Sequence, residues 1–429
     1  MSRPVPSRRD LLRYALAGTG FAALGPVGRG LSRAHAGTTS VKRLVVVHLD
    51  GGLDGPSLLV PRTLPSYFSR RPTIAIPDAA SLSLAGGPGG TAHRLHPSMP
   101  NLKALWDDGD VAFVHRVGYP EENLSHFESG DIFAYGVRGG TTSFLNLGIT
   151  PSGWMARMAD AHAPTPLGAV SLGMGRPTHL VGGSTPTVQV GSLWSFQFYP
   201  DWYDYNGHAR RKRYARDVLA LAGASGAEGE VRAALLQAHD LETQIQTATT
   251  QHDTFLDGQG LAYPDSWFAG RLSDAATLMH AGFETRTILT STGGYDTHGD
   301  QGGATGWLAD RLKEVDDAIG AFAADLKAQG RWDDTVLALY SEFGRRSYEN
   351  ASGGTDHGGA CEMILVGGAL TGGHFGVPMV DADLQDEYPL YAVDFRDVFR
   401  RILSNHLGMD PATVFPEAQP FTSPNLGFL

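Results

Sequence analysis

Cysteine and long hydrophobic runs are what this chain of 429 residues most clearly lacks. Cys361 is its single cysteine, so no disulfide can form within the chain, and a large core and any bound metal must supply its stability. The apolar stretch 14–27 is too short and too rich in glycine and alanine to span a bilayer. We therefore expect no transmembrane anchor in the mature chain. An excess of basic residues is also lacking, and the formal net charge of −11 argues against nucleic-acid binding.

The N-terminal residues have the composition of an export signal. Arg8 and Arg9 form a pair before the apolar stretch 14–27, and small residues follow it, as a signal peptidase requires. We predict that residues 1–36 are a twin-arginine signal peptide and that the twin-arginine translocase is a partner. The mature chain, 37–429, is then periplasmic or extracellular. This export route carries folded proteins, which fits a protein that binds a metal before export.

Short β-type runs alternate with helical patterns along the mature chain. The first run, 41–49, is β-branched with little polar alternation, which is typical of a strand covered on both faces. The other predicted strands are 111–115, 168–172, 285–290, 335–340 and 362–366, and the predicted helices are 100–107, 214–222, 230–247, 266–281, 304–328 and 395–406. This alternation predicts an α/β fold with a doubly wound, mostly parallel central sheet and helices on both faces.

One segment, from about residue 191 to 257, interrupts this alternation. It opens with aromatic residues and continues into long polar helical patterns. We interpret it as an inserted helical cap beside the functional site; alternatively, the aromatic side chains only seal the helices onto the sheet. These aromatic residues are Trp194, Phe196, Phe198, Tyr199, Trp202, Tyr203 and Tyr205.

Three blocks that follow β-type runs combine carboxylates with histidines, at residues 48–55, 295–300 and 341–359. Loops that follow parallel strands meet at one edge of the sheet, where open α/β folds bind their ligands. Asp, Glu and His side chains are ligands of divalent metals. The blocks therefore predict a metal site assembled from both ends of the chain, with Asp50, directly after a strand, as one ligand.

The order of several motifs resembles that of a known family. The motifs are the paired-arginine leader, HLDGGLDG at 48–55, NLSHFE at 123–128, GGYDTHGDQ at 293–301, and SEFGRR at 341–346 followed by GGTDHGG at 353–359. Together they resemble the bacterial family labelled domain of unknown function 1501, which is related by similarity to the alkaline phosphatase and sulfatase superfamily. The resemblance spans nearly the whole mature chain and implies the superfamily sheet.

The resemblance also implies roles for individual residues. Active superfamily members hold a nucleophile at a helix N-terminus beside two metals, and here Ser125 would be the nucleophile and Asp50 a metal ligand. The alternative for Ser125 is an ordinary helix N-cap. Asp296 and His357 match two ligands of the other metal. His298 follows Asp296 by two residues rather than the usual four, and we count it among the ligands.

The largest departure from active relatives lies at Glu342 and Phe343, where they carry an Asp-His pair. Glu342 can replace Asp as an oxygen ligand, Phe343 supplies none, and Asp356 beside His357 is a further carboxylate candidate. We expect one or two divalent ions (Zn, Mg, Ca or Mn), with oxygen-rich ligands favouring the last three. Arg345 is a candidate for bidentate capture of phosphate or sulfate; alternatively it pairs with a surface carboxylate.

Three functional hypotheses follow. The first is an exported metal-dependent hydrolase of phosphate or sulfate esters, acting on a small or polymeric anionic substrate through a serine nucleophile. The second keeps the fold without the chemistry: a secreted binding or assembly protein whose metal site is structural or degenerate. The third is a carbohydrate-active enzyme with paired carboxylates and an aromatic sugar groove, for which the sequence selects no carboxylate pair.

Overall fold

A computed structural model describes most of the chain from residue 41 onward. The described residues are 41–85, 93–139, 152–162, 165, 167–173, 178–185, 187–197, 207–221, 225–416 and 423–429. The predicted signal peptide, 1–36, lies outside them. None of the helices in the described ranges combines the length and apolarity needed to cross a membrane.

The core of the fold is a nine-stranded, mostly parallel sheet, which confirms the predicted α/β class. Its strands run in the order β13-β5-β12-β9-β1-β8-β6-β7, with β14 also paired to β5. Strand β12 is antiparallel to both β5 and β9, whereas the other pairings are parallel. The bounds are β1 Arg43–Asp50, β5 Val111–Gly118, β6 Ala169–Leu172, β7 Val188–Val190, β8 Thr287–Gly293, β9 Thr335–Tyr340, β12 Cys361–Val366, β13 Gly373–Gly376 and β14 Val393–Asp394.

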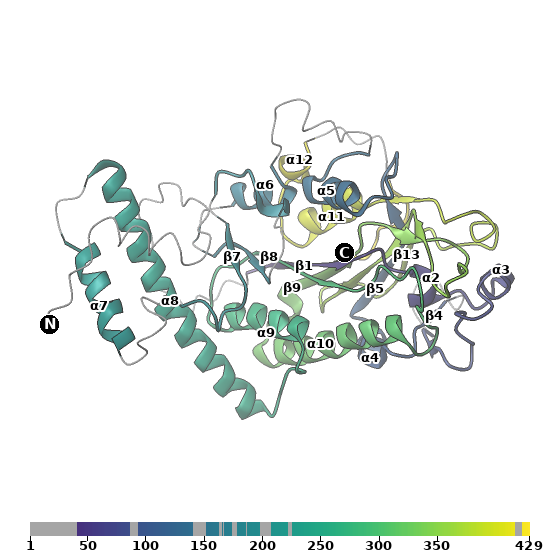
Figure 1. Cartoon of the computed structure of the whole chain (residues 1–429), viewed down its shortest axis with the longest axis horizontal. Helices are drawn as coiled ribbons and strands as arrows, with labels where there is room; N and C mark the ends of the chain where they lie inside the picture. Colours follow the sequence, from purple (N-terminus) through teal and green to yellow (C-terminus); the bar gives the residue numbers. More distant parts are fainter. Residues whose placement is uncertain are drawn as a thin grey trace.

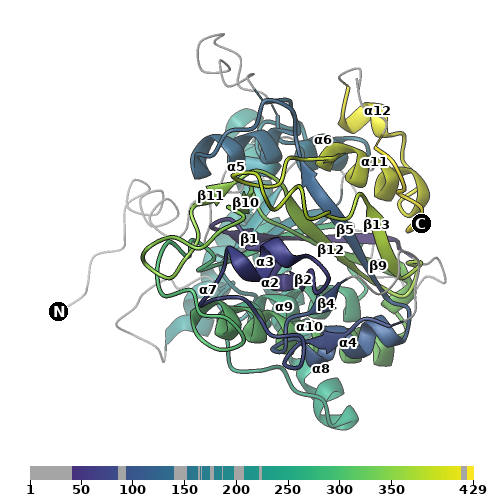
Figure 2. The same ribbon diagram turned by 90° about the vertical axis from the view of Figure 1, so that its right-hand side faces the viewer.

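Helices cover both faces of this sheet, as the alternation of patterns predicts (Figures 1 and 2). In both views α4, α9 and α10 lie on one face, and α5, α6, α11 and α12 lie on the other. The helix bounds are α2 Gly55–Leu58, α3 Pro65–Ser69, α4 Pro100–Asp107, α5 His126–Tyr135, α6 Trp154–Asp160, α7 His208–Leu219, α8 Gly226–Gln259, α9 Trp267–His280, α10 Trp307–Gln329, α11 Phe395–Asn405 and α12 Pro411–Val414.

Side chains of the central strand β1 belong to two hydrophobic cores, one on each face of the sheet. Successive side chains of a strand point to opposite faces. Leu44 and Val46 pack with residues of α5, α6 and α11, while Val45, Val47 and Leu49 pack with residues of α4, α9 and α10. All five side chains are buried. The unbroken apolar run of β1 therefore reflects burial on both faces, and it fixes this strand at the centre of the sheet.

Two small sheets accompany the central sheet in the described part of the chain. Strand β4, Arg94–Leu95, pairs with β2, Leu59–Val60, and with β3, Leu82–Ser83. A two-stranded ribbon pairs β10, Gly344–Arg345, with β11, His357–Gly358. This ribbon brings the motif that begins at Ser341 against the motif that ends at Gly359.

The predicted insertion contains two long helices, α7 and α8. Lys212 of α7 pairs with Glu242 of α8, and Gln246 of α8 donates to the carbonyls of Leu193 and Phe196. In Figure 1 both helices lie at the left, at the β7 end of the sheet, while α2, which follows β1, lies at the right. Phe198, Tyr199, Trp202, Tyr203 and Tyr205 lie outside the described residues. The division of the chain into a main domain and a helical cap stays a prediction.

Candidate metal centre

The carboxyl ends of three adjacent parallel strands bring the predicted motifs together. Asp50 ends β1 and is aligned with Gly293, the last residue of β8. Asp296 and Glu342 follow closely after β8 and β9. Figure 2 shows the side of the molecule that carries α2 and α3, which follow β1 along the chain. Parallel pairing thus places side chains from both ends of the chain at one edge.

The first group of possible metal ligands contains His48, Asp50 and Glu342. One ligand atom from each lies within 4.8 Å of the others. His48 Nε2 lies 2.8 Å from Glu342 Oε2, and the His48 ring stacks on Tyr340. His48 and Asp50 are alternate residues of β1, so they project from the same face of the strand.

The second group contains His126, Asp296 and His357, also with ligand atoms within 4.8 Å of one another. Asp296 Oδ1 lies 3.2 Å from His357 Nε2 and 3.2 Å from His298 Nε2. His298 Nε2 is 3.0 Å from His357 Nε2. The spacing of two residues between Asp296 and His298 therefore still brings both side chains to the same point.

His126 joins the two groups. Its Nδ1 lies 2.6 Å from Glu342 Oε1, and its Nε2 lies 3.5 Å from Asp296 Oδ2. That Nε2 is buried and has no hydrogen-bond partner among the described residues. An unpaired buried imidazole nitrogen beside a carboxylate is a position that a divalent cation fits, because the cation satisfies both groups.

The electrostatics keep Glu342 and Asp296 ionised. Burial raises the pKa of Glu342, but hydrogen bonds from His126 and His48 outweigh burial and hold that pKa well below its usual range. The bond to Glu342 raises the pKa of His126. Burial also raises the pKa of Asp296, and the neighbouring Arg345 lowers it below its usual value. Both carboxylates are therefore anionic near neutral pH, as metal ligands must be.

Arg345 is buried and organises the loops. Its Nε donates to the Gly52 carbonyl at 2.7 Å, and its Nη1 donates to the Thr355 carbonyl at 2.9 Å. Its Nη2 donates to the carbonyls of Gly51 and Tyr295 and, at 2.7 Å, to Asp296 Oδ1. The guanidinium predicted to capture an anion instead connects the loops that follow β1 and β8.

Two glycines let these loops approach one another. A Cβ on Gly51 would lie 2.4 Å from the backbone nitrogen of Asp296, and Gly51 has φ of +124°. A Cβ on Gly52 would meet the Phe343 ring at 2.6 Å. Phe343 itself lies with its ring centroid 4.8 Å from that of His126 and 4.7 Å from that of His357. The residue that supplies no ligand therefore packs against two candidate ligands.

Ser125 stands at the N-cap position of α5, directly before His126. Its backbone N–H donates to Asn123 Oδ1 at 2.8 Å. Its hydroxyl makes no capping hydrogen bond to the described first turn of α5. The position predicted as either nucleophile or cap therefore has the extended backbone conformation of an N-cap.

The remaining predicted site residue, Asp356, lies next to His298. Its Oδ1 is 2.9 Å from His298 Nδ1 and accepts from Asn350 Nδ2 at 3.1 Å. A carboxylate on the far nitrogen of a histidine orients that ring and makes it a better ligand. Asp356 is therefore placed to support His298.

Sequence reasoning did not select His48 or His126 as site residues. A single histidine carries no periodic signal, and most are structural. Two local signals existed: His48 shares a strand face with Asp50, and His126 follows Ser125 directly.

Comparison with known protein families finds a match to part of the chain. Residues 215–422 match the family described as "Protein of unknown function (DUF1501)". The resemblance predicted from the motifs is confirmed over that segment, which contains Asp296, Glu342 and His357; Asp50 and Ser125 precede it. No curated protein sequence matches the chain.

Several solved structures are similar to this chain at low identity. The lipoteichoic acid synthase LtaP from Listeria monocytogenes is 9% identical, with 86% of this chain and 73% of that chain covered and a TM-score of 0.38. The PsFucS1 sulfatase from Pseudoalteromonas sp. is 12% identical, with 90% and 75% covered and a TM-score of 0.35. Alkaline phosphatase from the Antarctic bacterium TAB5 is 11% identical, with 77% and 92% covered and a TM-score of 0.30. At these scores the likeness says nothing about the reaction.

Proposed function

We propose that the protein is an exported, metal-dependent hydrolase of phosphate or sulfate esters. The observation that supports this most is the position of His126, whose Nδ1 contacts Glu342 while its unpaired Nε2 faces Asp296. Two ligand groups joined by one histidine suit a pair of neighbouring divalent ions. Such a centre suits an anionic ester, small or polymeric, because the reaction concentrates negative charge on the transferring group.

The proposed ligands come from both groups of the centre. They are His48, Asp50 and Glu342 for one ion, and His126, Asp296, His298 and His357 for the other, with Asp356 orienting His298. Mixed imidazole and carboxylate ligands suit Zn or Mn better than Mg or Ca. Bound ions would neutralise the ester oxygens and favour the ionised serine hydroxyl.

Ser125 is the proposed nucleophile. Its oxygen forms a bond to phosphorus or sulfur, the bond from that atom to the alcohol oxygen breaks, and the hydroxyl proton leaves with the alcohol. Water then cleaves the seryl ester, which restores the serine and releases phosphate or sulfate. Arg345 acts as a positioning residue, since its donors are bound to loop carbonyls and to Asp296.

The test is turnover of aryl phosphates and aryl sulfates by natively exported, metal-loaded protein. We expect Ser125→Ala to lower kcat by at least about 10³-fold, as removal of a nucleophile does elsewhere. Metal content should be retained. The matched control is Ser404→Ala on α11, whose exposed hydroxyl bonds to the carbonyls of Arg400 and Arg401 and to Asn405.

Wild-type turnover in Ser125→Ala would exclude this nucleophile. No turnover of either ester class by protein that carries its ions would favour the second hypothesis, a secreted binding or assembly protein. One observation favours that second function: Phe343 packs against His126 and His357, where the resemblance implies a ligand.

Export is proposed separately from catalysis. Replacing Arg8 and Arg9 together by lysine should leave the precursor in the cytoplasm, because the paired arginines are the recognised feature of the leader. Arg33→Lys in the same leader is the control and should be exported normally. Fractionation followed by immunoblotting measures both. Export of the double variant at the wild-type level would contradict this route.

A further inference from the structure

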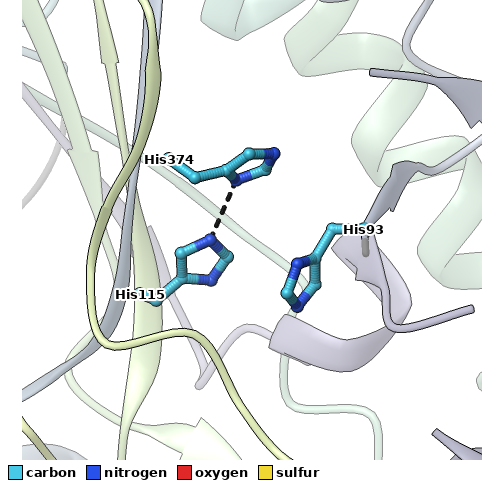
Figure 3. Close-up of side chains that lie close together, drawn as sticks. All are labelled: His93, His115 and His374. Carbon is cyan, nitrogen blue, oxygen red and sulfur yellow. Dashed lines mark hydrogen bonds between the residues drawn. The ribbon is translucent and has the colours of Figure 1, made fainter. Parts of the chain in front are cut away.

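A third group of histidines lies away from the candidate centre, on the face of the sheet that α4 covers. His115 belongs to β5, His374 to β13, and His93 lies just before β4. Figure 3 shows the three rings pointing toward one another. One nitrogen from each lies within 4.8 Å of the others, and His115 Nε2 is 2.9 Å from His374 Nδ1.

Glu362 of β12 completes this group. Its Oε1 lies 3.7 Å from His115 Nδ1. The four side chains are almost wholly buried: 3% of His93, 0% of His115, 2% of His374 and 1% of Glu362 is exposed. Carboxylates are rarely buried to this extent unless they are paired or bind a metal.

Several polar atoms of these four residues lack a hydrogen-bond partner among the described residues. Both carboxylate oxygens of Glu362, together with His93 Nε2, His115 Nδ1 and His374 Nε2, have no hydrogen-bond partner among the described residues. An unpaired buried polar group costs about 1–3 kcal/mol, and charged groups cost more. These five atoms belong to four neighbouring buried side chains, so a ligand that satisfies some of them would lower this cost.

The rings are ready to bind a cation. Burial of the three rings disfavours their protonated, charged form. Neutral imidazoles present a lone pair, which is the form that binds metals. Within the described part of the chain, Glu362 faces no lysine or arginine at salt-bridge distance.

The backbone is shaped to gather these side chains. Between Cys361 and Met363 on β12, the paired positions on β5 move from Val117 to Val114, so β5 carries a bulge of one extra residue. Arg116 in this bulge has φ of +54°, which a residue with a side chain rarely adopts. The bulge places His115 on the same face as Glu362.

The last glycine of the HLDGGLDG motif lies against the same buried group. A Cβ on Gly55, the first residue of α2, would lie 1.7 Å from Glu362 Oε2. The carboxylate therefore occupies the space that any side chain at position 55 would need.

We propose that His93, His115, His374 and Glu362 bind one divalent transition-metal ion, with zinc as the first candidate, in a closed structural site. Three imidazoles exclude Ca and Mg as preferred ions, because those take oxygen ligands. Full burial leaves no path for a substrate. The ion would tie the loop at His93 to β5, β12 and β13, segments separated by up to 281 residues in the sequence.

The experiment must separate this ion from any in the candidate centre. Asp296→Asn with Glu342→Gln removes a charged ligand from each of the two ion positions of that centre and leaves the buried group intact. After exhaustive dialysis of the full mature chain, elemental analysis of this double variant should find about one ion per chain. X-ray absorption at the metal edge should show histidine nitrogens and a carboxylate oxygen as ligands.

The matched pair is His93→Gln and His96→Gln in that double variant. Both histidines are buried, but His96 bonds to the Gly303 carbonyl and to the Ser98 N–H. We expect His93→Gln to lose the retained ion and His96→Gln to keep it. If His93→Gln does not fold, the absorption spectrum of the double variant alone decides, since it identifies the ligands directly.

An ion-free double variant, or one whose ion has no histidine ligands, would overturn the proposal. So would an ion that survives His93→Gln unchanged. Because the double variant lacks the candidate centre, these outcomes do not depend on whether the protein is a hydrolase.

Discussion

At the scale of single residues, the Glu342 carboxylate lies between two histidines of the candidate centre. Its two oxygens accept from or contact His126, His48, the Gly51 N–H and the Ser341 hydroxyl. It is 1% exposed. A carboxylate so placed fixes both rings, so their ligand nitrogens are oriented before an ion binds.

We predict that Glu342→Gln weakens metal binding at this centre by at least about 10-fold to 100-fold, the range found when groups that orient a ligand are removed. The substitution preserves shape and removes the charge. Isothermal titration of metal-free protein measures the affinity. The bond to Glu342 raises the pKa of His126, so its NMR titration should shift to lower pH in the variant.

The control for this substitution is Glu387→Gln. Glu387 pairs with Arg346 at 2.8 Å on the surface and is 55% exposed on its side chain. It should leave both the affinity and the His126 titration unchanged. An unchanged affinity in Glu342→Gln would remove Glu342 from the centre.

At the scale of elements, the buried ion pair between Asp54 and Arg71 connects the loops that carry the centre. Asp54, directly before α2, accepts from Arg71 Nη1 at 2.6 Å and from Gln301 Nε2 at 2.6 Å. Arg71, just beyond α3, also donates to the carbonyls of Arg346 and Ser347. This ion pair and its hydrogen bonds therefore connect the loops that follow β1, β8 and β9.

We predict that Asp54→Asn lowers the free energy of unfolding at pH 7 by about 3–5 kcal/mol, because it leaves the Arg71 charge buried without a partner. Burial raises the pKa of Asp54, but Arg71 outweighs burial and holds that pKa below the ordinary 3.8. Such a group stabilises the fold above its unfolded pKa, and this stability is lost as pH falls through the folded pKa.

The gap in stability between wild type and Asp54→Asn should therefore narrow as the pH falls below about 4. Urea unfolding at a series of pH values measures it. Asp78→Asn is the control, because Asp78 forms surface pairs with Arg62 and Arg94 and its side chain is 48% exposed. If the difference in the free energy of unfolding between wild type and Asp54→Asn stays constant down to acid pH, the proposed contribution of the ionised Asp54 to stability is wrong.

At the scale of the whole molecule, the sheet carries two ligand-rich regions of different depth. Asp296 and His298 in the candidate centre have side chains that are 48% and 47% exposed, whereas the group around His115 is buried. An ion at the exposed centre can leave directly. An ion in the buried group can leave only when the structure opens locally.

We predict that a strong chelator removes metal from the mature protein in two phases, a fast one from the exposed centre and a slow one from the buried group. Complete removal should lower Tm by about 5 °C, because ligands that bind only the folded state stabilise it by mass action. Dye-based metal release and calorimetry measure both effects.

His93→Gln should lose the slow phase and keep the fast one, and Asp296→Asn combined with Glu342→Gln should do the reverse. A single phase in the wild type, or an unchanged Tm after removal, would contradict the two-site description.

The sequence predicted the large elements well for a physical reason. The strand expected at 41–49 is β1, and the helices expected at 100–107 and 304–328 are α4 and α10. Each of these segments buries an apolar face over many residues, so the periodicity is repeated and strong. Strands β7, β13 and β14 are too short to give such a signal.

For the candidate centre, the sequence pointed to residues that directly follow strands, such as Asp50 and Glu342. The rule that loops meet at the carboxyl ends of parallel strands needs no side-chain detail. It could not select His126, which enters from α5, or assign Arg345 to the loop carbonyls rather than to an anion.

The sequence by itself therefore determined the order of strands and helices, the α/β class and the edge of the sheet where the motifs meet, since these depend on repeated local patterns. Only the tertiary structure decided which histidines share a site. His115 and His374 are 259 residues apart, and a bulge in β5 aims one of them at Glu362. Such contacts depend on close packing between distant segments, which no local pattern records.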